Sequence, residues 1–276
     1  MSKERIESKY FEVAPNVEIH YLEKGEGQPL IFIPGLTFSG EMFKGQIDYF
    51  SKNYRVIAID PRGQGLSSKP VDGNDYVTHG QDLAKLIDGL NLKDVVMTGW
   101  STGNLDTWSY VEQFGTEKLK GVCTIDMSPL PLSADPKWWT EGTMDELSEV
   151  ATKVLNTPEG TRNFFKDYAT GIMIEHKMND DEIEYIMDIS ARTPYWVCKA
   201  LFTDAIFSNY LQTAKKLGES FPSLMFIASH WADIAEEFVK NELPGYQTCI
   251  FGGHLMFYEY PDKWNTVFEN FIKSLS

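Results

Sequence analysis

The fold of this chain is decided by the stretch Val95-Val96-Met97-Thr98-Gly99-Trp100-Ser101-Thr102-Gly103-Asn104. An apolar run leads into a G-x-S-x-G pentapeptide, and the residues after it have helical spacing. A strand, a sharp turn and a helix in this order are the context that a nucleophile elbow requires. Glycine at 99 and 103 removes the Cβ atoms that would collide where strand and helix approach each other. We therefore expect Ser101 Oγ to project from a strained turn at the carboxyl edge of a sheet.

Strands alternate with helices on both sides of this stretch. Apolar or alternating runs predict strands at 10–13, 17–22, 30–33, 56–59, 95–97, 121–125, 224–228 and 248–251. Helical spacing predicts helices at 41–50, 78–90, 104–114, 233–240 and 261–275. The first two strands read as a hairpin. The remainder predicts an α/β fold with a mainly parallel sheet and right-handed crossovers.

The alternation stops between residues 128 and 222, after the sixth strand. Helical segments are expected around 138–155, 158–169, 180–191 and 194–217, and methionine and aromatic residues are dense there. A helical subdomain needs its own core, which explains most of these residues. Because the insert leaves the sheet at its carboxyl edge, where ligands bind in such folds, we also expect it to form an apolar lid. The domains are then a core of 1–127 with 223–276, and a lid of 128–222.

Composition limits the possible partners. The net charge of -15 disfavours nucleic acid and anionic membranes as partners, since both would repel the chain. The cysteines are scattered without metal-ligand spacing, so no metal is expected and a reducing compartment is favoured. No signal-peptide pattern opens the chain and no run of about 18 apolar residues occurs. We expect a cytoplasmic protein, monomeric or homodimeric, with a small-molecule substrate.

Four motifs in order resemble those of the α/β-hydrolase superfamily over nearly the whole chain. They are Ile33-Pro34-Gly35-Leu36, Asp60-Pro61-Arg62-Gly63-Gln64-Gly65-Leu66-Ser67, Gly99-Trp100-Ser101-Thr102-Gly103 and Gly252-Gly253-His254. Together they are highly specific for the fold and much less specific for the reaction.

The resemblance implies a role for several residues. Ser101 would be the nucleophile and His254 the general base that takes its proton. The backbone N–H groups of Leu36 and Thr102 would form an oxyanion hole. Trp100, inside the elbow, is a candidate substrate-binding residue. No cofactor is implied, and the other histidines, which lack such a context, are expected to be structural or on the surface: His20, His79, His176 and His230.

The third member of the triad departs from the common pattern. Family members usually carry the acid just after the strand that follows the lid, where this chain has Asp233 at the start of an expected helix. A few branches place it one strand earlier, where this chain has Asp126 at the end of the strand 121–125. A carboxylate there can reach the second nitrogen of His254 and fix its tautomer. We favour Asp126 over Asp233, for which a helix-terminus role is the plainer interpretation.

Three classes of function fit this sequence. The first is a serine hydrolase that cleaves an ester, thioester or lactone of a small, largely apolar substrate through an acyl-enzyme. The second is non-hydrolytic chemistry on the same fold, either C–C cleavage or cofactor-free oxygenation. The third is a non-catalytic receptor for a small ligand. Intact Ser101 and His254 favour the hydrolase, and serine at the nucleophile position excludes the dehalogenases and epoxide hydrolases that carry aspartate there.

Overall fold

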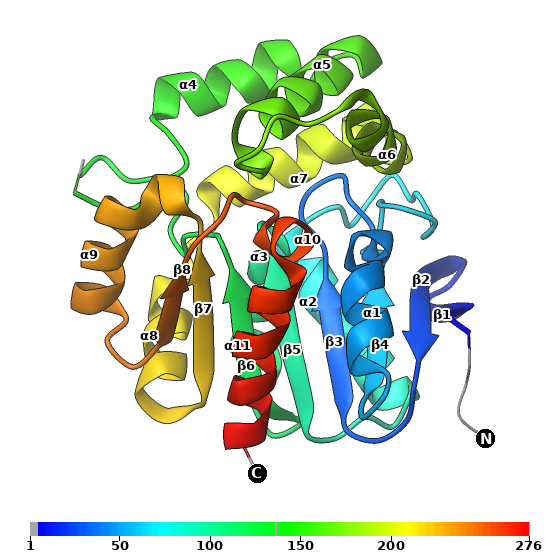
Figure 1. The fold of residues 1–276 in the computed structure, drawn as a ribbon. Helices are drawn as coiled ribbons and strands as arrows, with labels where there is room; N and C mark the ends of the chain where they lie inside the picture. Colours follow the sequence, from blue (N-terminus) through cyan, green and yellow to red (C-terminus); the bar gives the residue numbers. More distant parts are fainter. Residues whose placement is uncertain (1–4, 136, 276) are drawn as a thin grey trace.

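A single eight-stranded sheet runs through the computed structural model, which describes residues 5–135 and 137–275 (Figure 1). The strand order is β1-β2-β4-β3-β5-β6-β7-β8. The strands are β1 (Glu7–Ala14), β2 (Val17–Lys24), β3 (Pro29–Ile33), β4 (Arg55–Ile59), β5 (Val95–Trp100), β6 (Leu119–Ile125), β7 (Ser223–Ile227) and β8 (Gln247–Ile250). Strands β1 and β2 form an antiparallel hairpin, and β2 pairs antiparallel with β4. All other neighbouring pairs, from β4 through β3 and β5 to β8, are parallel. The predicted hairpin and mainly parallel sheet are therefore confirmed.

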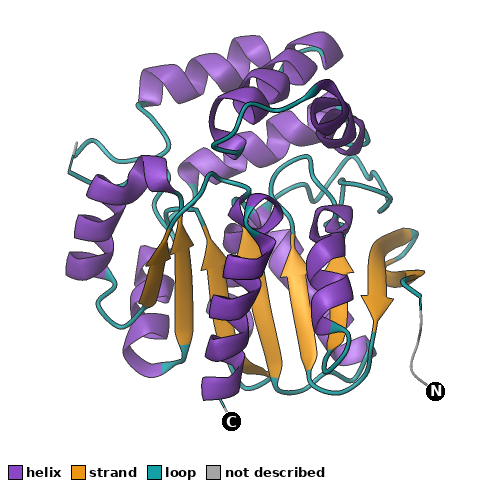
Figure 2. Cartoon of the chain, viewed as in Figure 1, coloured by secondary structure: helices purple, strands orange, loops and turns teal. Residues whose placement is uncertain are grey.

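Helices cover both faces of the sheet (Figures 1 and 2). One face carries α1 (Lys44–Phe50) and α11 (Pro261–Ser274), and the other carries α2 (Tyr76–Gly89), α3 (Gly103–Phe114) and α8 (Leu211–Ser220). The remaining core helices are η1 (Gly40–Phe43), η4 (Ser229–Trp231), α9 (Ala232–Glu242) and α10 (Met256–Glu259). Strands β3 and β5 are buried along their whole length, because helices lie on both sides of them. This rigid centre carries the elbow at its carboxyl end.

Four helices of the insert lie above the carboxyl edge of the sheet (Figure 1). They are α4 (Met144–Glu149), α5 (Pro158–Tyr168), α6 (Asp180–Ser190) and α7 (Tyr195–Phe207), with π-helical turns η2 (Val150–Val154) after α4 and η3 (Ala169–Met173) after α5. We call residues 128–210 the cap. The fifth helix, α8, does not join them, because it packs against α3 beside the sheet.

Two expected helices differ in extent from those observed. The segment expected from 138 begins only at Met144, because Thr143 and Glu146 form a capping box that sets the start of α4. The segment expected as one helix over 194–217 is two. Backbone at Ser208 is extended, and the Asn209 side chain accepts a hydrogen bond from Leu211 N at the start of α8.

Within the described residues, no helix combines the length and apolar character needed to cross a membrane.

Candidate active site

Ser101 occupies the sharp turn between β5 and α3, with a left-handed φ of 53°. The turn is possible because three glycines lack side chains. A Cβ on Gly99 would lie 2.4 Å from Gly103 O, and a Cβ on Gly103 would lie 2.4 Å from Ile33 O. A Cβ on Gly35 would lie 2.8 Å from Ser101 Cβ. Such contacts are closer than real Cβ atoms tolerate, so the strained serine and its glycines form one unit.

His254 is joined to Asp126 in the loop that follows β8. Its Nδ1 lies 2.6 Å from Asp126 Oδ2, and both side chains are buried. The other carboxylate oxygen, Oδ1, accepts a hydrogen bond of 2.8 Å from Ala228 N. Asp126 itself has a left-handed φ of 50°, which turns its side chain toward the histidine at the end of β6. Asp233, the alternative acid, lies instead on the exposed first turn of α9.

The backbone of His254 is held from two sides. Trp100 Nε1 donates a hydrogen bond of 2.8 Å to His254 O from the elbow side. From the cap, Ile172 O accepts from His254 N at 3.1 Å, and Met173 O accepts from Leu255 N at 2.6 Å. The π-helical turn η3 therefore fixes the histidine loop, so that cap and core position it together.

A cavity of about 400 Å³ lies between the elbow and the cap, lined by Ser101 and His254. The predicted oxyanion residues Leu36 and Thr102 also line it, and Thr102 is the N-cap of α3, where backbone N–H groups point outward. The aromatic side chains in its wall are Phe38, Trp100, Phe164, Phe165, Tyr168 and Phe202. The ring centroids of Tyr168 and His254 are 5.6 Å apart, edge to face. A mostly apolar chamber of this size suits a small organic molecule.

The other cap aromatics have different neighbours. Trp138 and Trp139 pack against Phe238 of α9, with ring centroids 5.6 and 6.3 Å apart. Phe207, at the end of α7, is 65% exposed. Helical spacing in the sequence does not distinguish these three residues from the aromatic residues that line the cavity.

Glu141 lines the same cavity and was missed by the sequence analysis. It precedes α4 in irregular backbone, and its N–H donates to Pro131 O at 2.8 Å. Burial and the nearby Asp126 carboxylate raise the pKa of Glu141 to about 7, although His254 acts in the opposite direction. No local pattern marks this residue, because its importance comes from the folded position of a loop.

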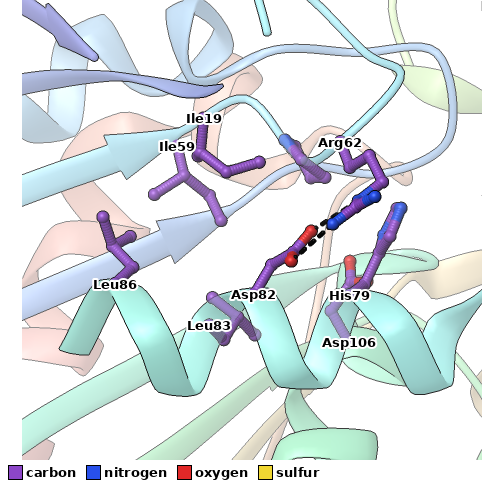
Figure 3. A pocket seen from close by; sticks show the side chains of 9 residues that line it. Ile19, Ile59, Arg62, His79, Asp82, Leu83, Leu86 and Asp106 are labelled. Carbon is purple, nitrogen blue, oxygen red and sulfur yellow. Dashed lines mark hydrogen bonds and ion pairs between the residues drawn. The ribbon is translucent and has the colours of Figure 1, made fainter. Parts of the chain in front are cut away.

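Three other histidines, His20, His79 and His176, form hydrogen bonds with carboxylates away from this cavity. The fourth, His230, lies in η4. Figure 3 shows His79 beside the Arg62–Asp82 pair, whose two hydrogen bonds measure 2.7 and 2.8 Å. His79 Nδ1 lies 2.7 Å from Asp106 on α3. The hollow there measures about 10 Å³, which leaves no room for a substrate. The Arg62–Asp82 pair joins the loop after β4 to α2, and the His79–Asp106 pair joins α2 to α3, so both serve the scaffold.

Within the described residues, no group of three or more histidine, cysteine, aspartate or glutamate side chains has the arrangement to hold a metal ion. The chemistry that the site offers is that of its own side chains. They are a hydroxyl on a strained turn, an imidazole bonded to a buried carboxylate, and a second carboxyl in the cavity wall.

Comparison with known proteins agrees with this geometry. The family model described as "alpha/beta hydrolase fold" matches residues 28–162, about half of the chain. A bromoperoxidase structure from Bacillus anthracis superposes with a TM-score of 0.87 at 21% identity, covering 97% of this chain and 100% of that one. An esterase structure from Exiguobacterium antarcticum gives a TM-score of 0.83 at 19% identity, covering 98% of this chain and 99% of that one. Residues 28–162 thus belong to the α/β-hydrolase superfamily, and the whole chain has its fold.

Curated relatives within the superfamily differ in reaction. A putative non-heme chloroperoxidase from Synechocystis sp. is 28% identical over 65% of this chain and 66% of its own length. A non-heme chloroperoxidase from Burkholderia pyrrocinia is 33% identical over 59% of each chain. An (E)-2-((N-methylformamido)methylene)succinate hydrolase from Acinetobacter baylyi is 37% identical over 36% of this chain and 38% of its own. The first two similarities span somewhat over half of each relative, and the relatives include hydrolases and haloperoxidases.

Proposed function

We propose that this chain is a serine hydrolase that cleaves an ester, thioester or lactone bond of a small, largely apolar substrate. The observation that carries the proposal is that Ser101 and His254 line one cavity while His254 Nδ1 is bonded to Asp126. That bond leaves Nε2 as the ring nitrogen available for proton transfer, as a general base requires.

In the proposed reaction, Ser101 Oγ attacks the substrate carbonyl carbon while His254 Nε2 takes the hydroxyl proton. The tetrahedral oxyanion would be stabilised by the N–H groups of Leu36 and Thr102. His254 then gives its proton to the leaving oxygen or sulfur, and an acyl-Ser101 ester remains. Water, deprotonated by His254, attacks that ester and releases the acid, which restores the serine. Asp126 would hold the productive tautomer and stabilise the imidazolium in both halves.

Substrate selection in this proposal belongs to the cap. Aromatic side chains from α5 and α7 form much of the cavity wall, and burying an acyl chain against them favours binding by about 0.8 kcal/mol per methylene. A lid function is supported by the position of α4–α7 above the edge of the sheet. The lid would comprise residues 128–210, shorter than the expected 128–222, because α8 packs on α3.

A second activity is favoured by the similarity to non-heme haloperoxidases. The acyl-enzyme would also accept hydrogen peroxide in place of water. The peroxide oxygen would displace Ser101, the carbonyl would become a percarboxylic acid, and that acid would oxidise bromide to hypobromous acid while returning to the carboxylic acid. Bromination of monochlorodimedone that requires peroxide, bromide and acetate together, and that is lost in Ser101→Ala, is the expected result.

The primary test is labelling with a fluorophosphonate probe, followed by hydrolysis of p-nitrophenyl esters. We expect Ser101 to carry the label and Ser101→Ala to lose both labelling and turnover by several orders of magnitude. Turnover within about tenfold of wild type in Ser101→Ala would exclude the covalent mechanism. Absence of both labelling and turnover in the wild type would instead favour a ligand receptor.

A further inference from the structure

We propose that Glu141 makes this cavity selective for substrates that carry a cationic nitrogen, such as a quaternary or protonated amine. The inference rests on the proposed hydrolase function and names the substrate class of the same site. It follows from the position of the Glu141 carboxyl, from the charges around it and from the rings beside it.

The position of Glu141 brings its carboxyl to the reacting groups. Glu141 lines the cavity that holds Ser101 and His254, and it interacts electrostatically with both Asp126 and His254. Its backbone is fixed by the bond to Pro131 O, and its carboxyl accepts a hydrogen bond from the backbone of Ser128. A carboxyl held in this way lies in the cavity wall, where a bound substrate would contact it, although the residue is only half-buried.

Apart from His254, the described cavity lining offers no group of the sign that would neutralise Glu141. No lysine or arginine occurs among the described residues that line the cavity, and none forms an ion pair with Glu141 in the described part of the chain. His254 is already committed to Asp126 at 2.6 Å. Glu146, at the rim, adds a second carboxylate, whose pKa is lowered by hydrogen bonds from Thr143. A desolvated carboxylate without a counterion is unfavourable, so a cationic ligand would relieve the cost.

The aromatic rings that line the same cavity as Glu141 suit such a ligand. Tyr168 interacts electrostatically with Glu141, and its ring is stacked near Phe164 with centroids 6.3 Å apart. Phe202 meets Phe164 edge to face at 6.1 Å. Aromatic faces attract cations through their quadrupole, and together with a carboxylate they form the usual surroundings of bound alkylammonium groups. An anionic substrate would meet two carboxylates and no cation, and would be rejected.

The test compares two ligands of the same shape and different charge. Choline and 3,3-dimethylbutan-1-ol differ only in N⁺ against C, as do butyrylcholine and 3,3-dimethylbutyl butyrate. Binding of the alcohols is measured by calorimetry, and hydrolysis of the esters by pH-stat titration, at about pH 8.5, where Glu141 is ionised. The variants are Glu141→Gln and, as a matched control, Asp145→Asn, which removes one negative charge from the first turn of α4 outside the cavity lining.

We expect wild type and Asp145→Asn to favour the cationic member of each pair by at least about tenfold, in binding and in kcat/KM. In Glu141→Gln both preferences should fall to within about twofold of unity. Equal affinity and equal kcat/KM for the two members in the wild type would overturn the inference. This comparison does not depend on whether the variant folds.

The two proposals fail in different ways. If Ser101 is labelled and the neutral ester is cleaved as well as butyrylcholine, the hydrolase stands and the cation selectivity is wrong. If Ser101 is not labelled but choline binds in a Glu141-dependent manner, the catalytic proposal fails and the cation site stands. If Glu141→Gln weakens both members of a pair equally, Glu141 supports only the shape of the cavity, and the inference is wrong.

Discussion

Asp126 and His254 are 128 positions apart in the chain, yet Asp126 Oδ2 lies 2.6 Å from His254 Nδ1. The bond joins the end of β6 to the loop after β8, across the intervening strand β7. Ala228 N, just after β7, holds the second carboxylate oxygen at 2.8 Å. The position after β7, the usual site of the acid in this superfamily, thus supplies a backbone donor to a carboxylate from the neighbouring strand.

This arrangement predicts a sharp difference between two aspartate variants. Asp126→Asn should lower kcat for p-nitrophenyl butyrate by about 10³ to 10⁴, because an amide favours the wrong imidazole tautomer and does not stabilise the imidazolium. Asp233→Asn, on the exposed first turn of α9, is the control and should change kcat by less than about twofold. The reverse ranking would return the acid to its usual position, and equal modest losses would mean that His254 works largely unassisted.

Backbone strain at Ser101 predicts that a glycine variant loses activity but gains stability. Ser101 has a φ of 53°, a conformation that costs a residue other than glycine about 1 kcal/mol or more. Ser101→Gly should therefore abolish turnover and raise the free energy of unfolding by up to about 1 kcal/mol. Ser101→Ala, which keeps the Cβ atom, should abolish turnover without that gain. Urea denaturation measures the difference, and equal stability of the two variants would mean that the surrounding turn does not strain the serine.

Much of this site followed from local sequence. The elbow was predictable because its strand, turn and helix are contiguous in sequence. Gly99 and Gly103 stand where backbone segments approach too closely for a side chain. The position of Asp126 beside His254 was predictable because the carboxyl ends of parallel strands share one edge of the sheet. Asp233 remained an alternative because the sequence does not fix the start of the next helix to within one residue. A later start would have left Asp233 in the loop, but α9 begins at Ala232 and so includes it.

The cap was predictable only in outline. Its helices followed from spacing, but α5 and α7 carry aromatic residues on more than one face, so spacing did not tell Phe202 from Phe207. Glu141 could not have been found, because it lies in irregular backbone ahead of the Thr143 capping box and meets Asp126 only through the path of a loop. Both failures concern positions that depend on the folded path of the chain and that no local sequence pattern specifies.

Glu141 also predicts how stability depends on pH. Burial raises its pKa from 4.5 to about 7 in the folded chain. Between these values the folded chain binds more protons than the unfolded chain, so this group lowers stability progressively as the pH rises through that range. The loss should total about 3 kcal/mol or less above pH 7. Glu141→Gln removes it, so the difference in free energy of unfolding between variant and wild type should grow between pH 5 and pH 8 in urea titrations. Groups shared by both proteins, among them Asp126 and His254, largely cancel in this difference, and parallel pH profiles would contradict the prediction.

The wall of the cavity predicts a shift in acyl-chain preference. Phe202 lines the chamber from α7, whereas Phe207, on the same helix, is 65% exposed. In the wild type, kcat/KM for p-nitrophenyl esters should rise from acetate toward butyrate by about fourfold per methylene, at about 0.8 kcal/mol each, until the chamber is full. Phe202→Ala removes a ring from the wall, so the optimum should move to a chain longer by two or more carbons. Phe207→Ala removes the same ring from solvent and should keep the wild-type optimum. Identical profiles in all three proteins would mean that the acyl chain lies elsewhere, and a falling profile in the wild type would mean that the chamber receives the leaving group instead.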